Sequence, residues 1–281
     1  MAEIVSPTIY YPHHVSDVQS YLTAVSRWHT DNKPTEKGYL GGVWFRGSGK
    51  VHPVPLRPGV YRDQFGKRAQ QFREKDEEEN RRQLERFMLG DFRTAGAMFL
   101  NTSSEVEIYF IAQHHKMPTR LLDWTTNPLA GLFFAVENEK EHDKEDGEVF
   151  IMQAKKLLPV PPEGARGSDY LWDVAGMRHP YVTGAIGDSF WLPSKYRAPL
   201  IIPVRPDHQP GRIGQQSSCF TLHMHNSKSA TNPTLVKIKI PKDRKRDMLN
   251  ELHRMNINQF TIYNDLDHLS MDIKRAWDVN A

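Results

Sequence analysis

Residues 113–125, QHHKMPTRLLDWT, form the densest group of side chains able to do chemistry. Nine of these thirteen side chains can form hydrogen bonds or titrate. We expect a loop here between two helices, and loops held by rigid elements often carry functional residues. Arg120 and Asp123 lie three residues apart and could pair with each other. Such a pair is commonly structural, so Asp123 acting as a general base is the rarer alternative.

A second candidate is Arg46, which follows the apolar segment 39–45 (YLGGVWF) and precedes Gly47. This segment predicts a short buried strand that ends at the arginine. A guanidinium at a strand end suits bidentate capture of a phosphate or carboxylate, and Gly47 would let a ligand approach closely. The alternative role for Arg46 is an ion pair that closes the strand end.

The third candidate is the segment 211–221 (GRIGQQSSCFT), a glycine-containing turn that leads into a strand. The amides of Gln215 and Gln216 could read a nucleobase or a carboxamide through paired hydrogen bonds, although glutamine is also ordinary in loops. The sequence contains no Walker A loop, no GxSxG elbow and no GxGxxG that opens a helix. P-loop hydrolases, α/β-hydrolases and Rossmann dehydrogenases therefore lose their main support.

Histidines are the remaining group with possible chemistry. His114 and His115 are adjacent, so they cannot both face one metal ion from a helix or a strand. His223 and His225 share a face of a predicted strand, but a third ligand would have to come from a distant residue such as His208. We expect no metal. The alternative is a metal-dependent nuclease that uses His114, Asp123, His208, His223 and His225.

Hydrophobic periodicity predicts an α+β fold, a single domain with a central mixed or antiparallel sheet flanked by helices. One predicted helix begins at Asn127, a typical N-cap, with Pro128 in its first turn. The expected helices are 16–28, 64–96 (one helix, or two with a break at Gly90), 104–111, 127–136, 248–255 and 266–277. The expected strands are 39–45, 149–153, 200–204, 220–225 and 235–240.

The chain divides into an N-terminal helical segment, residues 1–38, and a main domain, residues 39–281. The main domain contains a charged helical insertion around residues 64–100, whose charge run at 75–82 (KDEEENRR) is expected to form a solvated face. Residues 159–187 repeat glycine and proline without a sustained period, which predicts a long loop or a lid-like insertion.

Composition limits the class of protein. The 281 residues include 37 Lys and Arg against 34 Asp and Glu, a net charge of +3, which does not favour a protein that coats nucleic acid. A single cysteine, Cys219, fits a reducing compartment. No signal peptide and no membrane-spanning segment is indicated, so we expect a cytoplasmic protein that does not bind membranes.

Four motifs occur together in the chain: 44–47 (WFRG), 113–135 (QHHKMPTRLLDWTTNPLAGLFFA), 212–216 (RIGQQ) and 263–268 (YNDLDH). The sequences of these motifs and their order along residues 40–275 resemble those of the FRG domain family. This resemblance implies a cytoplasmic protein of bacteria or phages, of a kind often found in toxin or phage-defence modules.

Phe45, Arg46 and Gly47 are also similar to the strand end of ADP-ribosyltransferases, where an arginine followed by glycine anchors NAD. The similarity implies an ADP-ribosyltransferase-like fold in which these three residues hold the NAD diphosphate. The usual glutamate on a late strand has no counterpart near Gln216, so Asp123 is the substitute carboxylate. The remaining roles implied are cofactor binding by Gln113, Thr119, Arg120, Trp124 and Gln215, and catalysis by Asp123, His114 and Gln216.

The expected function is an NAD-dependent ADP-ribosyltransferase toxin of anti-phage defence or a toxin–antitoxin pair. NAD is its substrate, and RNA, specifically mRNA, is preferred over protein as the acceptor. A neutralising antitoxin is the expected protein partner, with residues 159–187 and 75–86 as surfaces open to it. The alternatives are a non-catalytic module that senses a nucleotide or phage protein and the metal-dependent nuclease.

Overall fold

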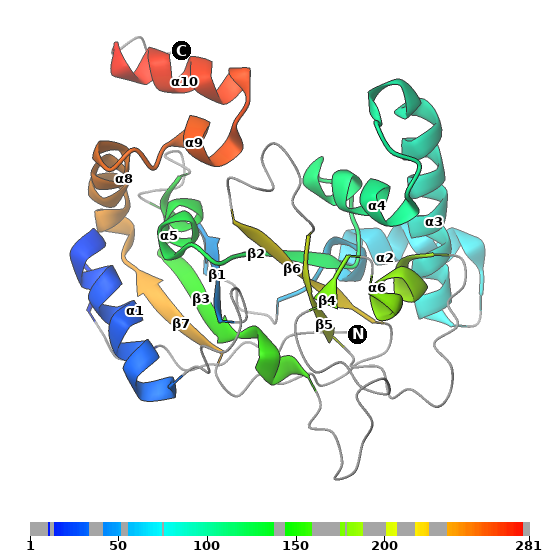
Figure 1. Ribbon diagram of the computed structural model, residues 1–281, viewed down its shortest axis with the longest axis horizontal. Helices are drawn as coiled ribbons and strands as arrows, with labels where there is room; N and C mark the ends of the chain where they lie inside the picture. The colour runs from blue at the N-terminus through cyan, green and yellow to red at the C-terminus, as the bar shows by residue number, and fades with distance from the viewer. Residues whose placement is uncertain are drawn as a thin grey trace.

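The computed structural model describes residue 11 and residues 14–33, 42–51, 56–74, 76–137, 144–158, 175–177, 179–187, 201–206, 217–224 and 235–277. Within these ranges, seven strands form one mixed sheet in the order β4-β5-β6-β2-β1-β3-β7 (Figure 1). The α+β class with a central mixed sheet is thus confirmed. The strands are β1 Val43–Ser48, β2 Leu121–Thr125, β3 Gly147–Gln153, β4 Ala175–Gly176, β5 Ile201–Arg205, β6 Ser218–His223 and β7 Val236–Ile240.

Helices gather at the two ends of the sheet. In Figure 1, α1 and α8 lie beside β7, whereas α2, α3, α4 and α6 lie at the end that carries β4. The short helices α9 and α10 lie above α5 and α8 in the same view. The helices are α1 Val18–Asn32, α2 Asp63–Ala69, α3 Glu77–Ala95, α4 Glu105–His114, α5 Pro128–Val136, α6 Pro180–Ile186, α8 Lys245–Arg254, α9 Gln259–Tyr263 and α10 Leu266–Ala276. No helix in the described ranges is both long and apolar enough to cross a membrane.

Helix α5 is the best predicted element, and its local signals explain why. The side chain of Asn127 accepts hydrogen bonds from the backbone N–H groups of Leu129 and Ala130, and Pro128 occupies the first turn. Both features satisfy or remove backbone donors that a helix start leaves without a partner. The helix packs its fully buried Leu132 and Phe133 into the core between the sheet and helices α1 and α8.

Strand β2 corrects the expectation of a loop between the helices. Residues 121–125 pair with β6 along their whole length, from Leu121 opposite Leu222 to Thr125 opposite Ser218. Leu121 and Trp124 face opposite sides of the sheet and both are buried. Four of its five residues, on both faces, are buried and only Asp123 is exposed, so the strand lacks a regular alternation of apolar and polar residues, and five residues are too few to show another pattern.

Strand β1 extends to Ser48, so Arg46 and Gly47 lie within the strand and not after its end. A Cβ atom on Gly47 would lie 2.0 Å from the carbonyl oxygen of Gly131 and 2.7 Å from the backbone nitrogen of Ala135. The space beside Gly47 is therefore filled by helix α5. This glycine permits close packing of the helix on the strand, and it also lines the candidate pocket described below.

Helix α3 buries several charged side chains that were expected to face solvent. Glu78, Arg81 and Glu85 are buried, whereas the side chain of Phe87 is 63% exposed. Arg81 donates to the carbonyl oxygens of Val60, at 2.6 Å, and of Arg62. The helix packs against a turn whose carbonyl groups accept from Arg81, so part of the charge run points inward, whereas Glu77, with a side chain 65% exposed, faces solvent.

Two further differences concern element boundaries. Gly90 lies inside α3, and the break in the charged insertion falls at residues 70–76, between α2 and α3. Residues 175–187 of the expected long loop hold strand β4 and helix α6, with residue 178 outside the described ranges. The rest of the segment 159–187 also lies outside them.

Candidate active site

A pocket of about 360 Å³ lies where β1, β2 and β6 meet the ends of α4 and α5 and helix α9. Strands β1 and β2 pair at one position, Phe45 opposite Thr125, so the two strands part beyond this pair. The parting of the strands is where the pocket forms. Of the residues predicted from the sequence, the pocket is lined by Phe45, Arg46, Gly47, Gln113, His114, Asp123 and Trp124.

Arg46 bridges the two strands at the pocket. Its Nη1 donates to the backbone carbonyl of Asp123 at 2.7 Å and lies 3.8 Å from the Oδ2 atom of the same residue. The carbonyl accepts from the guanidinium where the pairing of β1 with β2 has ended. Arg46 therefore has the structural role considered above, an ion pair at the strand, in addition to any role in binding. Because a guanidinium carries five N–H donors, the contacts through Nη1 leave capacity for an anion.

The Asp123 carboxylate is held in place by a chain of side chains. Gln113 Nε2 donates to both carboxylate oxygens, at 3.1 and 2.9 Å. The hydroxyl of Thr119 donates to Gln113 Oε1, which sets the direction in which the amide faces. Thr119 is itself buried. It was predicted to bind the ligand; in the structure it is not among the residues that line the pocket, and its hydroxyl contacts Gln113, which does line it.

The charge of Arg46 is not fully compensated by the protein. Burial lowers the pKa of the Arg46 guanidinium, Asp123 opposes this effect, and the positive charge of Arg62 adds to it. Arginine remains protonated in proteins because its ordinary pKa is so high. The site therefore holds a desolvated cation that an anionic ligand would stabilise.

Sequence reasoning missed two titratable residues of the pocket, Glu137 and Tyr263. The Tyr263 hydroxyl, on α9, donates to Glu137 Oε2 at 2.6 Å, just beyond the end of α5. Burial raises the pKa of Glu137, opposed by this hydrogen bond and by the charges of His268 and Lys116. Tyr263 had a signal in the motif 263–268. Glu137 had none, because it begins a charged segment that follows a helix.

Two predicted ligand-binding residues have their side-chain partners outside the pocket, although Trp124 is among the residues that line it. Arg120 pairs with Glu85 on α3, with 2.8 Å between Nε and Oε2, and does not pair with Asp123. The indole of Trp124, 3% exposed, donates from Nε1 to the hydroxyl of Thr221 inside the core. Side chains alternate across a strand, so Trp124 points to the face of β2 opposite Asp123. Both residues therefore stabilise the scaffold around the pocket.

Among the described residues of the nuclease alternative, His223 does not lie beside Asp123. His223 is buried and lies within hydrogen-bond distance of Thr221, on the face of β6 opposite the one that faces Asp123. In the described part of the chain, no group of three His, Cys, Asp or Glu residues is placed to hold a metal ion. The remaining predicted residues, Gln215, Gln216, His208 and His225, lie outside the described residues.

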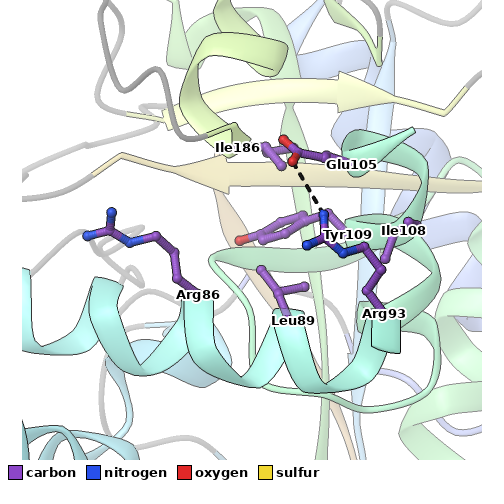
Figure 2. Close-up of a pocket in the computed structure, with 8 residues that line it drawn as sticks. Arg86, Leu89, Arg93, Glu105, Ile108, Tyr109 and Ile186 are labelled. Atoms are coloured by element: carbon purple, nitrogen blue, oxygen red, sulfur yellow. Dashed lines mark ion pairs between the residues drawn. The ribbon is translucent and has the colours of Figure 1, made fainter. Parts of the chain in front are cut away.

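A second pocket, of about 160 Å³, lies between α3 and α4 beside Ile186 of α6. Figure 2 shows Arg93 pointing toward Glu105, to which it is ion-paired at 3.6 Å, while Arg86 points away from this pair. The guanidinium of Arg93 is thus neutralised by a protein carboxylate. This pocket is also smaller, so the Arg46 pocket is the stronger candidate for a ligand site.

Comparison with known protein families finds a match to part of the chain. The family model of the FRG domain matches residues 41–144, which contain Arg46, Gln113, His114, Asp123 and Glu137. The motifs at 212–216 and 263–268 lie beyond the matched range. No curated protein and no solved structure matches the chain. The chain therefore carries an FRG domain over residues 41–144.

Proposed function

We propose that this protein is an NAD-dependent ADP-ribosyltransferase toxin of anti-phage defence or a toxin–antitoxin pair, with the Arg46 pocket as its active site. One observation carries the proposal: an incompletely compensated arginine stands beside an oriented carboxylate in a pocket of about 360 Å³. A pocket of this size suits a small ligand with a few placed polar groups. The guanidinium supplies the contact that a diphosphate needs.

The proposed reaction breaks the bond between C1′ of the ribose and the nicotinamide nitrogen. The electron pair of this bond moves to the nicotinamide ring and removes its positive charge, and C1′ becomes oxocarbenium-like. A carboxylate near C1′ stabilises this developing charge, as in glycoside cleavage. Asp123 fits this role because Gln113 and Arg46 fix its position. An acceptor hydroxyl then bonds to C1′ and releases its proton.

RNA is the proposed acceptor. His114 and Lys116 line the same pocket as Arg46 and offer local donors to a phosphate or a base. The chain as a whole is nearly balanced in charge, so such binding would depend on these few contacts and not on the average charge. A neutralising protein that covers this pocket is the matching proposal for a partner.

Turnover of NAD by the purified protein, with and without RNA, tests this function. We expect nicotinamide release and transfer of labelled ADP-ribose to RNA, reduced about 100-fold or more in Arg46→Ala and in Asp123→Asn. Arg57→Ala is a matched control, because Arg57 has the same 22% side-chain exposure, pairs with Asp63 and lies outside the pocket. Asp247→Asn, which also removes one member of a 3.8 Å ion pair, is the control for Asp123→Asn.

Two outcomes would contradict the transferase. One is a wild-type protein that releases no nicotinamide, and the other is full activity in Arg46→Ala. Binding of ADP-ribose by calorimetry without any turnover would instead support a non-catalytic nucleotide sensor. The specific observation in favour of a sensor is that Gln113 already engages both oxygens of Asp123, an arrangement that also suits recognition.

A further inference from the structure

A chain of four side chains leads from the Arg46 pocket to helix α10. Tyr263 donates to Glu137 Oε2 at 2.6 Å. The Tyr263 ring stacks on the imidazole of His268, with 4.1 Å between ring centroids and 19° between planes. His268 Nδ1 lies 2.6 Å from Asp265 Oδ1. Glu137 and Tyr263 line the pocket, so the chain begins where a ligand would bind.

Each contact restricts the next side chain along this path. Asp265 caps α10 by accepting from the backbone N–H of His268, and the same oxygen faces His268 Nδ1. A carboxylate at Nδ1 orients the imidazole. The stacked imidazole in turn holds the phenol ring of Tyr263. The Tyr263 hydroxyl then fixes Oε2 of Glu137, and Oε1 takes no part in this hydrogen bond.

We propose that Glu137 is the general base of the pocket, positioned by Tyr263, His268 and Asp265. The role rests on the proposed transferase function. As the acceptor oxygen bonds to C1′, its O–H bond breaks and the proton passes to Glu137 Oε1. The carboxylic acid formed there loses the proton to solvent after the product leaves. No other reactant is needed, because nicotinamide departs with the electron pair of the broken bond.

Asp123 and Glu137 have different surroundings, which assigns them different roles. Both oxygens of Asp123 accept from Gln113, and Arg46 is paired with the same group. This carboxylate is suited to stabilise positive charge. Glu137 accepts one hydrogen bond from a phenol, and burial makes it more basic than an ordinary glutamate. Where two carboxylates of one site lie in different environments, one commonly stabilises positive charge and the other transfers a proton.

The pH dependence of the rate follows from the groups around Glu137. Only the ionised carboxylate accepts a proton, so activity rises with pH through the raised pKa of Glu137. Tyr263, His268 and Lys116 all lower this pKa. Losing any of them therefore moves the acidic limb, the part of the pH–rate profile where activity rises with pH, to higher pH. The other charged or titratable groups that line the pocket are Arg46, His114 and Asp123.

Transfer and nicotinamide release across pH, in wild type and variants, test the general base. We expect Glu137→Gln to lower kcat for transfer about 100-fold or more, to remove the acidic limb and to leave KM for NAD unchanged. Tyr263→Phe and His268→Gln retain Glu137, and we expect both to shift the limb to higher pH. A merely structural role would lower the rate at every pH without moving the limb.

Two matched controls lie outside the pocket. Glu251→Gln changes a half-buried glutamate whose Oε2 accepts from the backbone N–H of Val18 at 2.9 Å. Tyr21→Phe removes a buried hydroxyl that donates to the Pro128 carbonyl at 2.9 Å. Both should keep the wild-type pH profile. An active wild type together with an unaffected Glu137→Gln variant, or an unmoved limb in Tyr263→Phe, overturns this inference alone. A wild type without nicotinamide release overturns the transferase proposal itself.

Discussion

Two groups of arginine, carboxylate and tyrosine occupy this molecule, and they differ in how completely their charges are compensated. In the first, Arg120 and Glu85 are 6% and 3% exposed and lie 2.8 Å apart. In the second, Arg46 and Asp123 are 22% and 54% exposed and lie 3.8 Å apart. The first group lies between α3 and α4 and borders a smaller pocket of about 210 Å³, whereas the second borders the Arg46 pocket of about 360 Å³.

The pKa values of the two arginines move in opposite directions. Burial acts to lower the pKa of Arg120, but Glu85 and the nearby Tyr109 outweigh it, and the value is raised. At Arg46 burial prevails and the pKa is lowered. A cation paired closely with a buried carboxylate stabilises the fold, whereas a cation with a more distant and exposed partner next to a cavity can still gain from a ligand. The same residue types thus serve stability in one place and binding in the other.

The largest expected effect separates the two arginines by stability. Arg120→Met leaves Glu85 buried without its cation and should lower the free energy of unfolding by about 3–5 kcal/mol. Arg46→Met removes a half-exposed pair and one hydrogen bond, so we expect a loss of about 1 kcal/mol. Urea denaturation of both variants measures the difference. Equal losses would show that the two groups are not distinct in role.

The next effect concerns the two glycines near these groups. Gly47→Ala forces a Cβ against the backbone of α5 and should cost about 1–3 kcal/mol or more. Gly90, inside α3, has nothing within 4 Å of such an atom, so Gly90→Ala should raise the free energy of unfolding by about 0.5–1 kcal/mol. Thermal unfolding of both variants is the measurement. A tolerated Gly47→Ala would contradict the tight seating of α5 on β1.

Tyr109 and Tyr263 should differ less than the arginines in their contribution to the free energy of unfolding. The Tyr109 hydroxyl donates to Glu85 and accepts from the backbone N–H of Arg120 at 2.8 Å, all within the first group. Tyr109→Phe should therefore lower the free energy of unfolding by about 1–3 kcal/mol, because buried polar groups lose a partner. For Tyr263→Phe we expect about 1 kcal/mol or less, since Glu137 borders the pocket. Matched denaturant titrations would refute the contrast if Tyr263→Phe proved the more damaging.

The smallest effect is a pH dependence of stability at Glu137. Its pKa is raised in the folded protein, so the folded state binds this proton more tightly than the unfolded state does. The free energy of unfolding therefore falls as pH rises from the ordinary glutamate pKa through the raised one. Glu137→Gln should be more stable than wild type near neutral pH, and the gap should close in acid. Urea denaturation at several pH values, with Glu251→Gln as control, would reveal an absent or reversed trend.

Local signals predicted much of the fold. The cap at Asn127 and the apolar residues after it predicted α5, and alternation predicted β3, β5, β6 and β7. These signals lie within the element that they specify. Strand β2 was missed because its five residues are too few to show a regular alternation. The inward charges of α3 were missed because their partners lie elsewhere in the chain.

The candidate site was predicted in part for the same reason. Arg46, Gln113, His114 and Asp123 were selected by residue type and motif, and the structure brings them to one pocket. Arg120 and Trp124 came from the same motif, but their side chains bind Glu85 and Thr221 in the interior of the protein. Glu137 could be recognised as a site residue only from the tertiary structure, in which α9 brings Tyr263, 126 residues away in the chain, into contact with it.

The sequence by itself determined which segments are helical or extended and which residue types are available for chemistry. These properties depend on backbone propensities and on partners a few residues apart. Only the tertiary structure decided which charges are compensated. Arg46 meets Asp123 across 77 residues, and Arg120 meets Glu85 across 35. Whether a charged group stabilises the fold or stands ready for a ligand depends on such distant partners and on the solvent that they exclude.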